Sequence, residues 1–529
     1  MNTRMWQALS VAAALFTVGL AACTDTTVEP KSTITDANIF NDPNSYRAFL
    51  AKIYGGLALS GQQGPAGQPD ISGIDEGFSQ YLRLYWETEE LPTDEAVIAW
   101  NDIGLPEMNT QLWTAQSNMV VAMYYRIYFQ VSLANEFLRQ TTDAKLASRG
   151  VSASLRADIQ TYRAEARFLR ALSLWHGIDL FGDVPLVTEA DPVGSTPPKQ
   201  STRVDVYNFI VSELNDIKGS LPAAGPNTYG RATPGAADML LAELYLNAGV
   251  YTGTPNYAGA LNAASSVIGS GAYSLDPNYH RMFLADNNTS PEIIFPITQD
   301  GLKTQTWGGV TFLVHASCGG SMSNTTYGID GCWWGLRLKP EAYNNFAAGD
   351  GRASYFYTAG QNLTFSTVDD RSNFTVGAAA PKFQNVTSGG AAGSNATFVD
   401  ADFPVFRLAE AYLIYAEAAL RGGGGTKTQA LAYVNALRER AYGNTTGDLA
   451  DTTALTLPFV LAERGRELLW EAHRRTDLVR YGLFTGGGYV WTLKGNTVGG
   501  TSTDAFRDLY PLPASELVAN PNLKQNPGY

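Results

Sequence analysis

The sequence predicts a mainly α-helical protein built as one large domain, and three observations support this prediction. Apolar residues recur three and four positions apart through several long segments, as they do on one face of an amphipathic helix. Two segments, each about 34 residues long, look like copies of one helical hairpin. Stretches rich in Gly, Asn and Thr separate the helical segments and predict long irregular loops with short strands.

Residues 1–22 have the features of a secretory signal. Arg4 supplies a positive charge, and the apolar run from Ala8 to Ala22 is shorter than the roughly 20 apolar residues that span a bilayer. Small residues precede Cys23, as in a bacterial lipobox, so we expect Cys23 to become a lipidated N-terminus that carries palmitate or a related acyl chain. The alternative is an ordinary signal peptide that ends near a cysteine by chance. Residues 23–35 are polar, contain a proline and predict an extended tether.

Helical periodicity marks three segments of the N-terminal part of the domain, residues 36–230. The spacing predicts helices over residues 43–58, around 113–137 and over 162–180. The third helix is expected to end at the Gly and Pro residues of the segment 181–185, because these residue types terminate helices.

The C-terminal part, residues 231–529, contains the two similar hairpins. Residues 236–268 and 406–438 each read as a helix, a Gly-containing turn and a second helix, and an offset of 170 aligns Tyr245 with Tyr415. Their length is typical of a tetratricopeptide repeat, whose hairpins must stack to bury their apolar faces. The alternative is chance, because any Ala-rich pair of helices has a similar pattern.

Two further stretches, residues 59–112 and 285–400, have little helical periodicity. Alternation of apolar and polar residues predicts short strands at 292–297 and 362–368. Irregular segments of this length are uncommon in compact domains unless they bind something. We therefore expect a binding site in these loops.

The composition excludes several classes of protein. Aromatic residues make up 11% of the chain and charged residues 16%, which excludes a disordered chain. The net charge of −13 and the lack of a basic run exclude a nucleic-acid-binding protein. With three Cys and four His, and no His or Cys at ligand spacing from His473, we expect no metal site and no cofactor. The acidic loops at 369–370 and 400–402 permit structural calcium without specifying it.

The segment 463–480 is rich in charged residues. Glu463, Arg466, Glu467, Glu471 and Arg474 lie at helical offsets of three or four, so we expect ion pairs along one helix face. A catalytic pair of carboxylates is the less favoured alternative, because each carboxylate has an arginine nearby that keeps it ionised.

Five blocks of sequence resemble the signature segments of the SusD/RagB family. They occur in the family's order and cover almost the whole chain after the signal. The blocks lie at residues 162–187, 231–246, 403–418, 463–482 and 509–529.

This resemblance implies a SusD-like fold, largely helical, in which four tetratricopeptide-like hairpins form a scaffold. It also implies a lipid-anchored protein of the outer membrane that faces the cell surface. Such a protein captures nutrients, usually oligosaccharides, and delivers them to a SusC-like TonB-dependent barrel without catalysis. Three alternatives stay open: a peptide-binding member of the family, a scaffold that binds only the barrel, and a surface glycosidase that draws its acid pair from Asp94, Glu95 or Asp330.

A glycan site needs aromatic rings for the apolar faces of sugars and short polar side chains for their hydroxyls. Two loop regions, 81–101 and 305–334, offer both, and the family resemblance places ligand contacts in the same two regions. The alternative is that these aromatic residues pack in the core. The candidate ligand-binding residues are Tyr81, Arg83, Trp86, Trp100, Asn101, Trp307, Trp333 and Trp334.

Cys318 and Cys332 lie within the second of these regions. At an oxidising cell surface we expect them to form a disulfide, which would stabilise the fold by about 3 kcal/mol. The alternative is two free, buried thiols.

Overall fold

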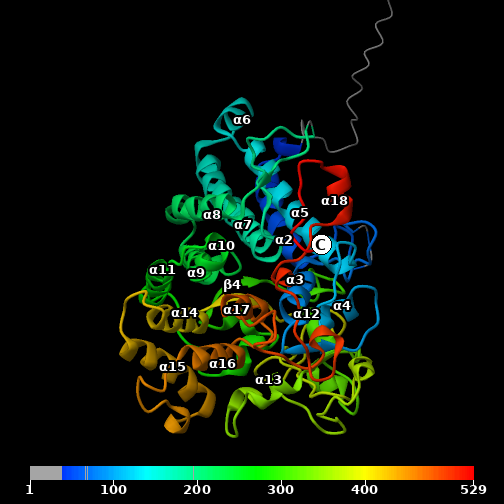
Figure 1. Ribbon diagram of the computed structural model, residues 1–529. Coiled ribbons are helices and arrows are strands. Elements are labelled where there is room, and N and C mark those ends of the chain that lie inside the picture. The colour runs from blue at the N-terminus through cyan, green and yellow to red at the C-terminus, as the bar shows by residue number, and fades with distance from the viewer. Residues whose placement is uncertain (1–38, 66, 68, 195) are drawn as a thin grey trace, which may run out of the picture. The chain divides into compact units, whose positions relative to one another are not determined.

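Figure 1 shows the computed structural model, which describes residues 39–65, 67, 69–194 and 196–529. The described residues separate into two units, one that ends at Tyr46 and one that comprises Arg47–Tyr529. The predicted signal, the tether and Cys23 lie outside the described residues. Helix α2 (Asn44–Ala58) follows the single turn Ile39–Asn41 and agrees with the helix predicted over 43–58. Within the described ranges, no helix has the length and apolar character needed to cross a membrane.

Long helices dominate the N-terminal half of the second unit. The predicted helices around 113–137 and over 162–180 are confirmed as α5 and α7, which pack against each other. Helix α7 begins earlier than predicted, where the Ser152 hydroxyl accepts the N–H of Leu155, and it ends at Gly182, whose φ is 75°. The helices of this half are α3 (Tyr81–Glu90), α4 (Leu105–Thr110), α5 (Asn118–Gln140), α6 (Asp143–Ser148), α7 (Ala153–Phe181) and α8 (Arg203–Ile217).

The two predicted hairpins are confirmed. The first consists of α9 (Pro234–Leu246) and α11 (Tyr257–Gly269), with the short α10 (Ala248–Thr252) between them, and the second of α14 (Leu408–Leu420) and α15 (Lys427–Tyr442). Helix α11 packs against both α9 and α14, so the hairpins stack as repeat units do. In Figure 1 they follow one another from green to yellow down one side of the ribbon.

In the described part of the chain, three pairs of short antiparallel strands join separate segments. They are β1 (Ala96–Ile98) with β5 (Leu336–Leu338), β2 (Val184–Pro185) with β3 (Gln200–Ser201), and β4 (Ile293–Ile297) with β6 (Phe403–Arg407). The strand predicted at 292–297 is confirmed as β4. The strand predicted at 362–368 is wrong, because the Asp370 carboxylate accepts the backbone N–H groups of Ser366 and Thr367 that a strand ladder would use.

The expectation of little helix in residues 59–112 and 285–400 is wrong in part. Helices α3 and α4 lie in the first stretch, and α12 (Gly309–Ala316) and α13 (Pro340–Asn344) lie in the second. Every residue of α3 is buried, including the charged residues Arg83, Glu87 and Glu90, which are typical of exposed positions. The remaining helices are α16 (Leu457–Glu467), α17 (Arg474–Arg480) and α18 (Ala514–Ala519).

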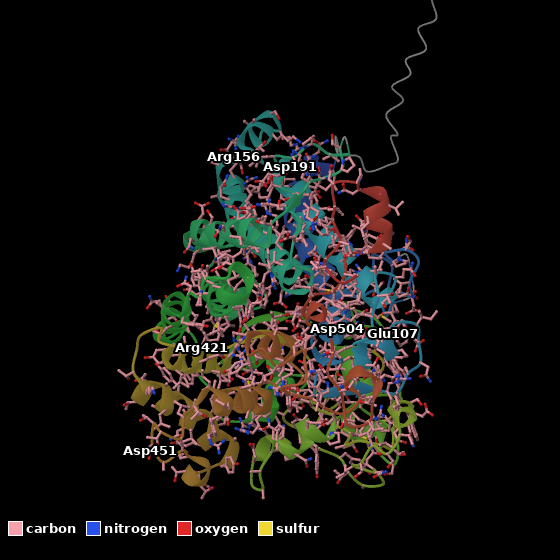
Figure 2. All side chains as sticks on the ribbon, in the orientation of Figure 1. Glu107, Arg156, Asp191, Arg421, Asp451 and Asp504 are labelled. Atoms are coloured by element: carbon pink, nitrogen blue, oxygen red, sulfur yellow. A yellow bond between two sulfur atoms is a disulfide. The ribbon has the colours of Figure 1, made fainter. Side chains whose placement is uncertain are left out.

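The segment 463–480 differs from the single charged helix face that its sequence predicts. The chain leaves the helix after Glu467, and Trp470 and Ala472 adopt left-handed backbone angles, with φ of 62° and 63°. Three ion pairs within the segment do form: Glu463 with Arg466, Arg464 with Asp477, and Asp477 with Arg480. The charged side chains are buried, however, and most of their partners come from other elements. Exposed carboxylates such as Asp191 and Asp451 lie elsewhere in the chain (Figure 2).

Two buried arginines hold this segment against the rest of the unit. The Arg407 guanidinium, at the end of β6, binds Glu292 at 2.8 Å, Glu467 at 2.7 Å and Glu471 at 2.6 Å. Arg352 binds Glu463 at 2.7 Å and Glu467 at 2.9 Å. We refer to Glu292, Arg352, Arg407, Glu463, Glu467 and Glu471 as the buried ion network.

Neighbouring arginines stabilise the ionised carboxylate of Glu463 by more than its burial destabilises it. Burial alone would raise the pKa of Glu463, but Arg352, Arg466 and Arg438 outweigh it and lower the pKa to about 2. A carboxyl whose pKa is depressed in the folded state stabilises the fold at pH values above its unfolded pKa, here 4.5. That contribution is lost as the pH falls toward 2.

We predict that Glu463→Gln lowers the free energy of unfolding by about 3–5 kcal/mol near neutral pH, because it leaves buried arginine charges without a partner. The difference from the wild type should shrink between pH 4.5 and 2, where the native carboxyl becomes protonated. Denaturant unfolding followed by circular dichroism at several pH values measures both effects. Glu439→Gln, on the exposed face of α15, is the matched control, and equal losses in the two variants would contradict the prediction.

Candidate functional site

Pairing of β1 with β5 brings the two predicted binding regions together. Ile98 lies opposite Leu336, and just beyond the strands the Ala99 N–H donates to the Gly335 carbonyl at 2.9 Å. The indole N–H of Trp100 donates to the Trp333 carbonyl at 3.0 Å. A side chain at Gly335 would meet the Trp100 ring, so glycine permits this close approach.

Three tryptophans gather at this junction, and Trp334 directly follows one of them in the chain. We call Trp100, Trp307, Trp333 and Trp334 the aromatic surface. The Trp333 ring centroid lies 6.4 Å from that of Trp100 and 6.1 Å from that of Trp307. On its other side Trp333 stacks on His315, with centroids 4.4 Å apart and planes 23° apart. Trp100, Trp307 and Trp333 are partly buried, so their rings are held in position by neighbours.

Trp334 differs from the other three because it faces solvent. Its side chain is 48% exposed, and it is the only tryptophan among the large hydrophobic residues exposed in the described chain. Its φ of 56° lies in the left-handed region, which is rare for a bulky residue and needs surrounding structure to hold it. The Trp334 N–H donates to the Cys318 carbonyl at 2.9 Å, which helps to fix this geometry.

A disulfide joins Cys318, just after the end of α12, to Cys332, just before the paired tryptophans. Two further hydrogen bonds tie the backbone around it to α12. Trp333 N–H donates to the His315 carbonyl at 2.8 Å, and Gly335 N–H donates to the Ala316 carbonyl at 2.8 Å. Trp333 and Trp334 therefore sit beside a covalently closed loop over a rigid helix.

Polar side chains border the aromatic surface. Asn101 is exposed and accepts a hydrogen bond from Arg371, whose guanidinium also donates to the Trp100 carbonyl at 2.9 Å. Asp330, within the disulfide loop, is exposed and accepts from the Thr397 hydroxyl. These groups can exchange hydrogen bonds with hydroxyls of a ligand that lies on the rings.

Three of the predicted ligand residues lie in the interior, which corrects the sequence-based assignment. Tyr81, Arg83 and Trp86 are 1%, 3% and 0% exposed because α3 is enclosed on all sides. The Tyr81 hydroxyl bonds His176 at 2.7 Å and the Trp86 indole donates to the Trp470 carbonyl at 3.0 Å. No ligand reaches these side chains directly.

Arg83 has a supporting position beneath the surface. Its guanidinium carbon lies 3.8 Å from the Phe78 ring centroid, 4.1 Å from that of Phe312 and 5.5 Å from that of Trp100. Its Nε donates to Glu87 at 2.8 Å. Arg83 thus packs under Trp100 and holds its ring from below.

The acidic residues of the alternative glycosidase differ in their surroundings. Arg474 binds both oxygens of Asp94 at 2.7 Å, and the Tyr489 hydroxyl donates to Asp94 at 2.6 Å. Burial raises the pKa of Glu95 to about 8, although Arg474 lies nearby. Both groups line a cavity of about 330 Å³ that also contains Glu341. Asp330 is separate from them on the exposed loop.

The acidic loops considered for calcium use their carboxylates to hold backbone. Asp400 accepts the N–H groups of Gly301 and Ser394, and Asp402 accepts that of Gln299 at 2.7 Å. Asp370 accepts two backbone N–H groups, as described above. These hydrogen bonds account for the acidic residues as turn-forming groups.

A larger groove lies between α5, the segment 185–201 and α18. Its volume is about 950 Å³, and Tyr125, Tyr128, Arg139 and Glu516 line it. The groove combines aromatic and charged side chains, as the aromatic surface does. Unlike that surface, it has no tryptophan among its described lining residues.

Sequence reasoning missed several residues that build the site. Phe374 packs against Trp334 at 5.8 Å, Phe398 packs against Trp307 at 4.9 Å, and Arg371 holds Asn101. They come from loops 40 to 270 residues away along the chain, so no local pattern marks them. The Asn- and Thr-rich composition of these loops indicates the region of the site, but it does not identify the individual residues.

Known proteins resemble this chain over almost its full length. A model of the SusD family matches residues 370–529. The starch-binding protein SusD of Bacteroides thetaiotaomicron is 36% identical over 91% of both chains, and SusD-like protein P2 of Formosa agariphila is 28% identical over 80% of this chain and 83% of its own.

Solved structures share the fold. Surface glycan-binding protein A of Bacteroides thetaiotaomicron superposes with a TM-score of 0.70 at 21% identity, covering 93% of this chain and 100% of that one. Its complex with laminarihexaose gives a TM-score of 0.68 at 21% identity, covering 91% and 98% of the two chains. These relatives are named as binding proteins, in agreement with the expectation that the chain is not an enzyme. At the identity and coverage of the starch-binding relative, the chain belongs to the SusD family.

Proposed function

We propose that the chain is a glycan-binding lipoprotein of the outer membrane, which captures oligosaccharides at the cell surface and delivers them to a SusC-like TonB-dependent barrel. The observation that carries glycan binding is Trp334, a flat ring that packs on Phe374, directly follows Trp333 in the chain and is kept exposed by a left-handed backbone. A large apolar ring that the fold holds in water is explained by a ligand that covers it. Sugar rings do so through their C–H faces.

The polar groups beside the rings support an oligosaccharide over a purely apolar ligand. Asn101 and Asp330 flank the aromatic surface and offer an amide and a carboxylate to sugar hydroxyls. The relative with the greater identity is named as starch-binding, whereas the structure solved with laminarihexaose is only 21% identical. We therefore propose a starch-type α-glucan as the ligand class.

Preorganisation is the physical basis of the proposed capture. The disulfide, the backbone hydrogen bonds to α12 and the Arg83 side chain under Trp100 hold the rings before a ligand arrives. A preorganised surface loses little conformational entropy on binding, which favours capture of a flexible polymer. The lipid at Cys23 would keep this surface near the barrel that receives the sugar.

We predict that Trp334→Ala weakens binding of starch-derived oligosaccharides by about 1–3 kcal/mol, because the substitution removes an exposed stacking ring. Trp334→Phe keeps a flat ring and should retain most of the affinity. Titration calorimetry on the detergent-solubilised mature protein measures both variants. Unchanged affinity in Trp334→Ala would place the glycan elsewhere.

We predict that replacing both Cys318 and Cys332 by Ser lowers the free energy of unfolding by about 3 kcal/mol through loop-closure entropy. The same change should weaken glycan binding, because the loop that leads to Trp333 and Trp334 loses its covalent closure. Chemical denaturation and calorimetry on one preparation separate the two effects. A loss of stability at full affinity would show that the disulfide is dispensable for the site.

We predict that Cys23→Ser moves the protein from the membrane fraction to the soluble fraction, because the substitution removes the lipidated side chain. Membrane fractionation followed by immunodetection measures the distribution. Ser32→Ala, a change in the predicted tether, serves as the control. Retention of Cys23→Ser in membranes would contradict the lipobox assignment.

A further inference from the structure

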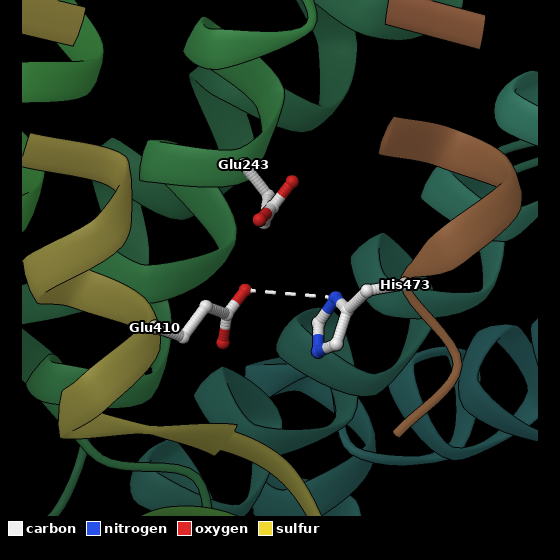
Figure 3. A group of neighbouring side chains, drawn as sticks. All are labelled: Glu243, Glu410 and His473. Carbon is white, nitrogen blue, oxygen red and sulfur yellow. Dashed lines mark ion pairs between the residues drawn. The ribbon is translucent and has the colours of Figure 1, made fainter. Parts of the chain in front are cut away.

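Three ionisable side chains that the proposed function does not use meet inside the helical scaffold. They are Glu243 of α9, Glu410 of α14 and His473, the residue before α17, and Figure 3 shows their polar ends directed toward one another. One ligand atom from each lies within 4.8 Å of the others. The residues are 1%, 0% and 7% exposed. We call them the Glu–Glu–His cluster.

A repeated sequence motif places the two carboxylates. Leu-Ala-Glu-x-Tyr-Leu occurs at 241–246 in α9 and again at 408–413 in α14. Both helices pack against α11 and against each other, so the Glu of each copy is aimed at the same interior point. Neither carboxylate is needed to solubilise its helix, since both lie on buried faces.

His473 reaches this point from the break between α16 and α17. The Glu90 carboxylate accepts the N–H of Ala472 at 2.7 Å and that of His473 at 3.3 Å, which fixes the backbone here. Nδ1 of His473 then lies 3.8 Å from Oε1 of Glu410. This separation is too long for a hydrogen bond and suits two ligands of one ion.

Several carboxylate oxygens of the Glu–Glu–His cluster have no hydrogen-bond partner. Both oxygens of Glu410 and Oε1 of Glu243 are buried with no hydrogen-bond partner. The other oxygen of Glu243, Oε2, accepts a hydrogen bond from the Asn247 side chain at 2.9 Å. The Arg464 guanidinium lies 3.5 Å from Oε1 of Glu243, and its Nε binds Asp477 at 2.7 Å. A buried carboxylate without partners costs several kcal/mol, so a compensating group is required.

A shared proton compensates only part of this deficit. One proton between Glu243 and Glu410 would satisfy one oxygen of each and leave the second Glu410 oxygen unpaired. A divalent cation bound by both carboxylates and the imidazole would neutralise two negative charges and engage the cluster as a whole. Metal–ligand bonds of about 2.0–2.2 Å place ligand atoms roughly 3–4 Å apart. His473 and Glu410 already lie at 3.8 Å, and the three ligand atoms, which lie within 4.8 Å of one another, would move closer together on binding an ion.

We propose that Glu243, Glu410 and His473 form a buried structural site for a divalent transition-metal ion of the zinc class. Two carboxylates and one imidazole match the ligands of such ions, with a water molecule as the fourth ligand. Calcium is a poor match, because it takes six to eight oxygen ligands. The ion would connect α9, α14 and the start of α17, and it is independent of the glycan surface.

The expectation of no metal site around His473 considered only His and Cys at ligand spacing along the chain. The carboxylate ligands are 230 and 63 residues away from His473, and helix packing alone brings them to it. The repeat of Leu-Ala-Glu-x-Tyr-Leu is the signal in the sequence that marks both.

The site is enclosed, so the ion must enter while the chain folds. We would unfold the detergent-solubilised mature protein in guanidinium with a chelator, refold it with or without Zn²⁺, remove free metal and measure bound zinc by mass spectrometry. We expect one zinc per chain and a higher melting temperature after refolding with zinc. Refolding with Co²⁺ should give the visible absorption of a tetrahedral site.

Substitutions at the proposed ligands test where the zinc ion binds. Glu410→Gln and His473→Asn should retain little zinc and show no melting shift with it, whereas Glu417→Gln, which removes a buried carboxylate of the same helix outside the cluster, should retain one. Without metal, Glu410→Gln should melt no lower than the wild type, because neither side-chain oxygen of Glu410 has a hydrogen-bond partner that the substitution could remove.

Three results would overturn the proposal. The first is a refolded wild-type protein that retains no zinc, which would leave a shared proton or a buried water as the compensating group. The second is equal zinc in the wild type and in Glu410→Gln and His473→Asn. The third is a zinc-bound wild type that melts at the same temperature as the metal-free protein.

Discussion

The Arg407 guanidinium lies between the end of β6 and the start of α14, and it binds carboxylates from three other places in the chain: Glu292 before β4, Glu467 at the end of α16, and Glu471 in the break that follows. Buried charges stabilise a fold only when every partner is present, since the loss of one leaves the others uncompensated. Arg352 adds Glu463 to the same group. The packing of the second hairpin against the α16–α17 segment therefore depends on a set of ion pairs that form together.

Ion pairs of the α16–α17 segment also position the aromatic surface, because they hold α3 and the residues that follow it. Arg475 binds Glu89 at 3.3 Å, and Arg474 binds Asp94 at 2.7 Å, which fixes the start of the chain that leads through β1 to Trp100. Strand β1 then pairs with β5 and places Trp100 beside Trp333. The aromatic surface proposed to bind glycan thus lies at the exposed side of elements, α3 and β1, whose own positions depend on buried ion pairs.

The sequence allowed prediction of the helical scaffold, because its long helices and its two hairpins have strong local patterns. It did not reveal α3 as an interior helix, because its arginine and glutamates are of residue types that usually lie at the surface, whereas here they are buried. The same residues made Tyr81, Arg83 and Trp86 resemble a polar, aromatic loop and led to their wrong assignment as ligand contacts.

In the candidate site too, local sequence patterns identify some of the residues, whereas only the fold identifies the others. The sequence predicts Trp100, Trp333 and Trp334 as ligand residues in two separate loop regions, yet only the fold brings these regions together and distinguishes the exposed Trp334 from the partly buried others. Supporting residues such as Arg371 and Phe374 act across the fold and have no local signature. The central claim is that the aromatic surface is the glycan site, and a crystal structure of the protein with a starch-derived oligosaccharide tests it most directly. We expect a sugar ring stacked on Trp334. An oligosaccharide bound in the groove beside α5 and α18, with Trp334 still exposed to solvent, would contradict this assignment of the site.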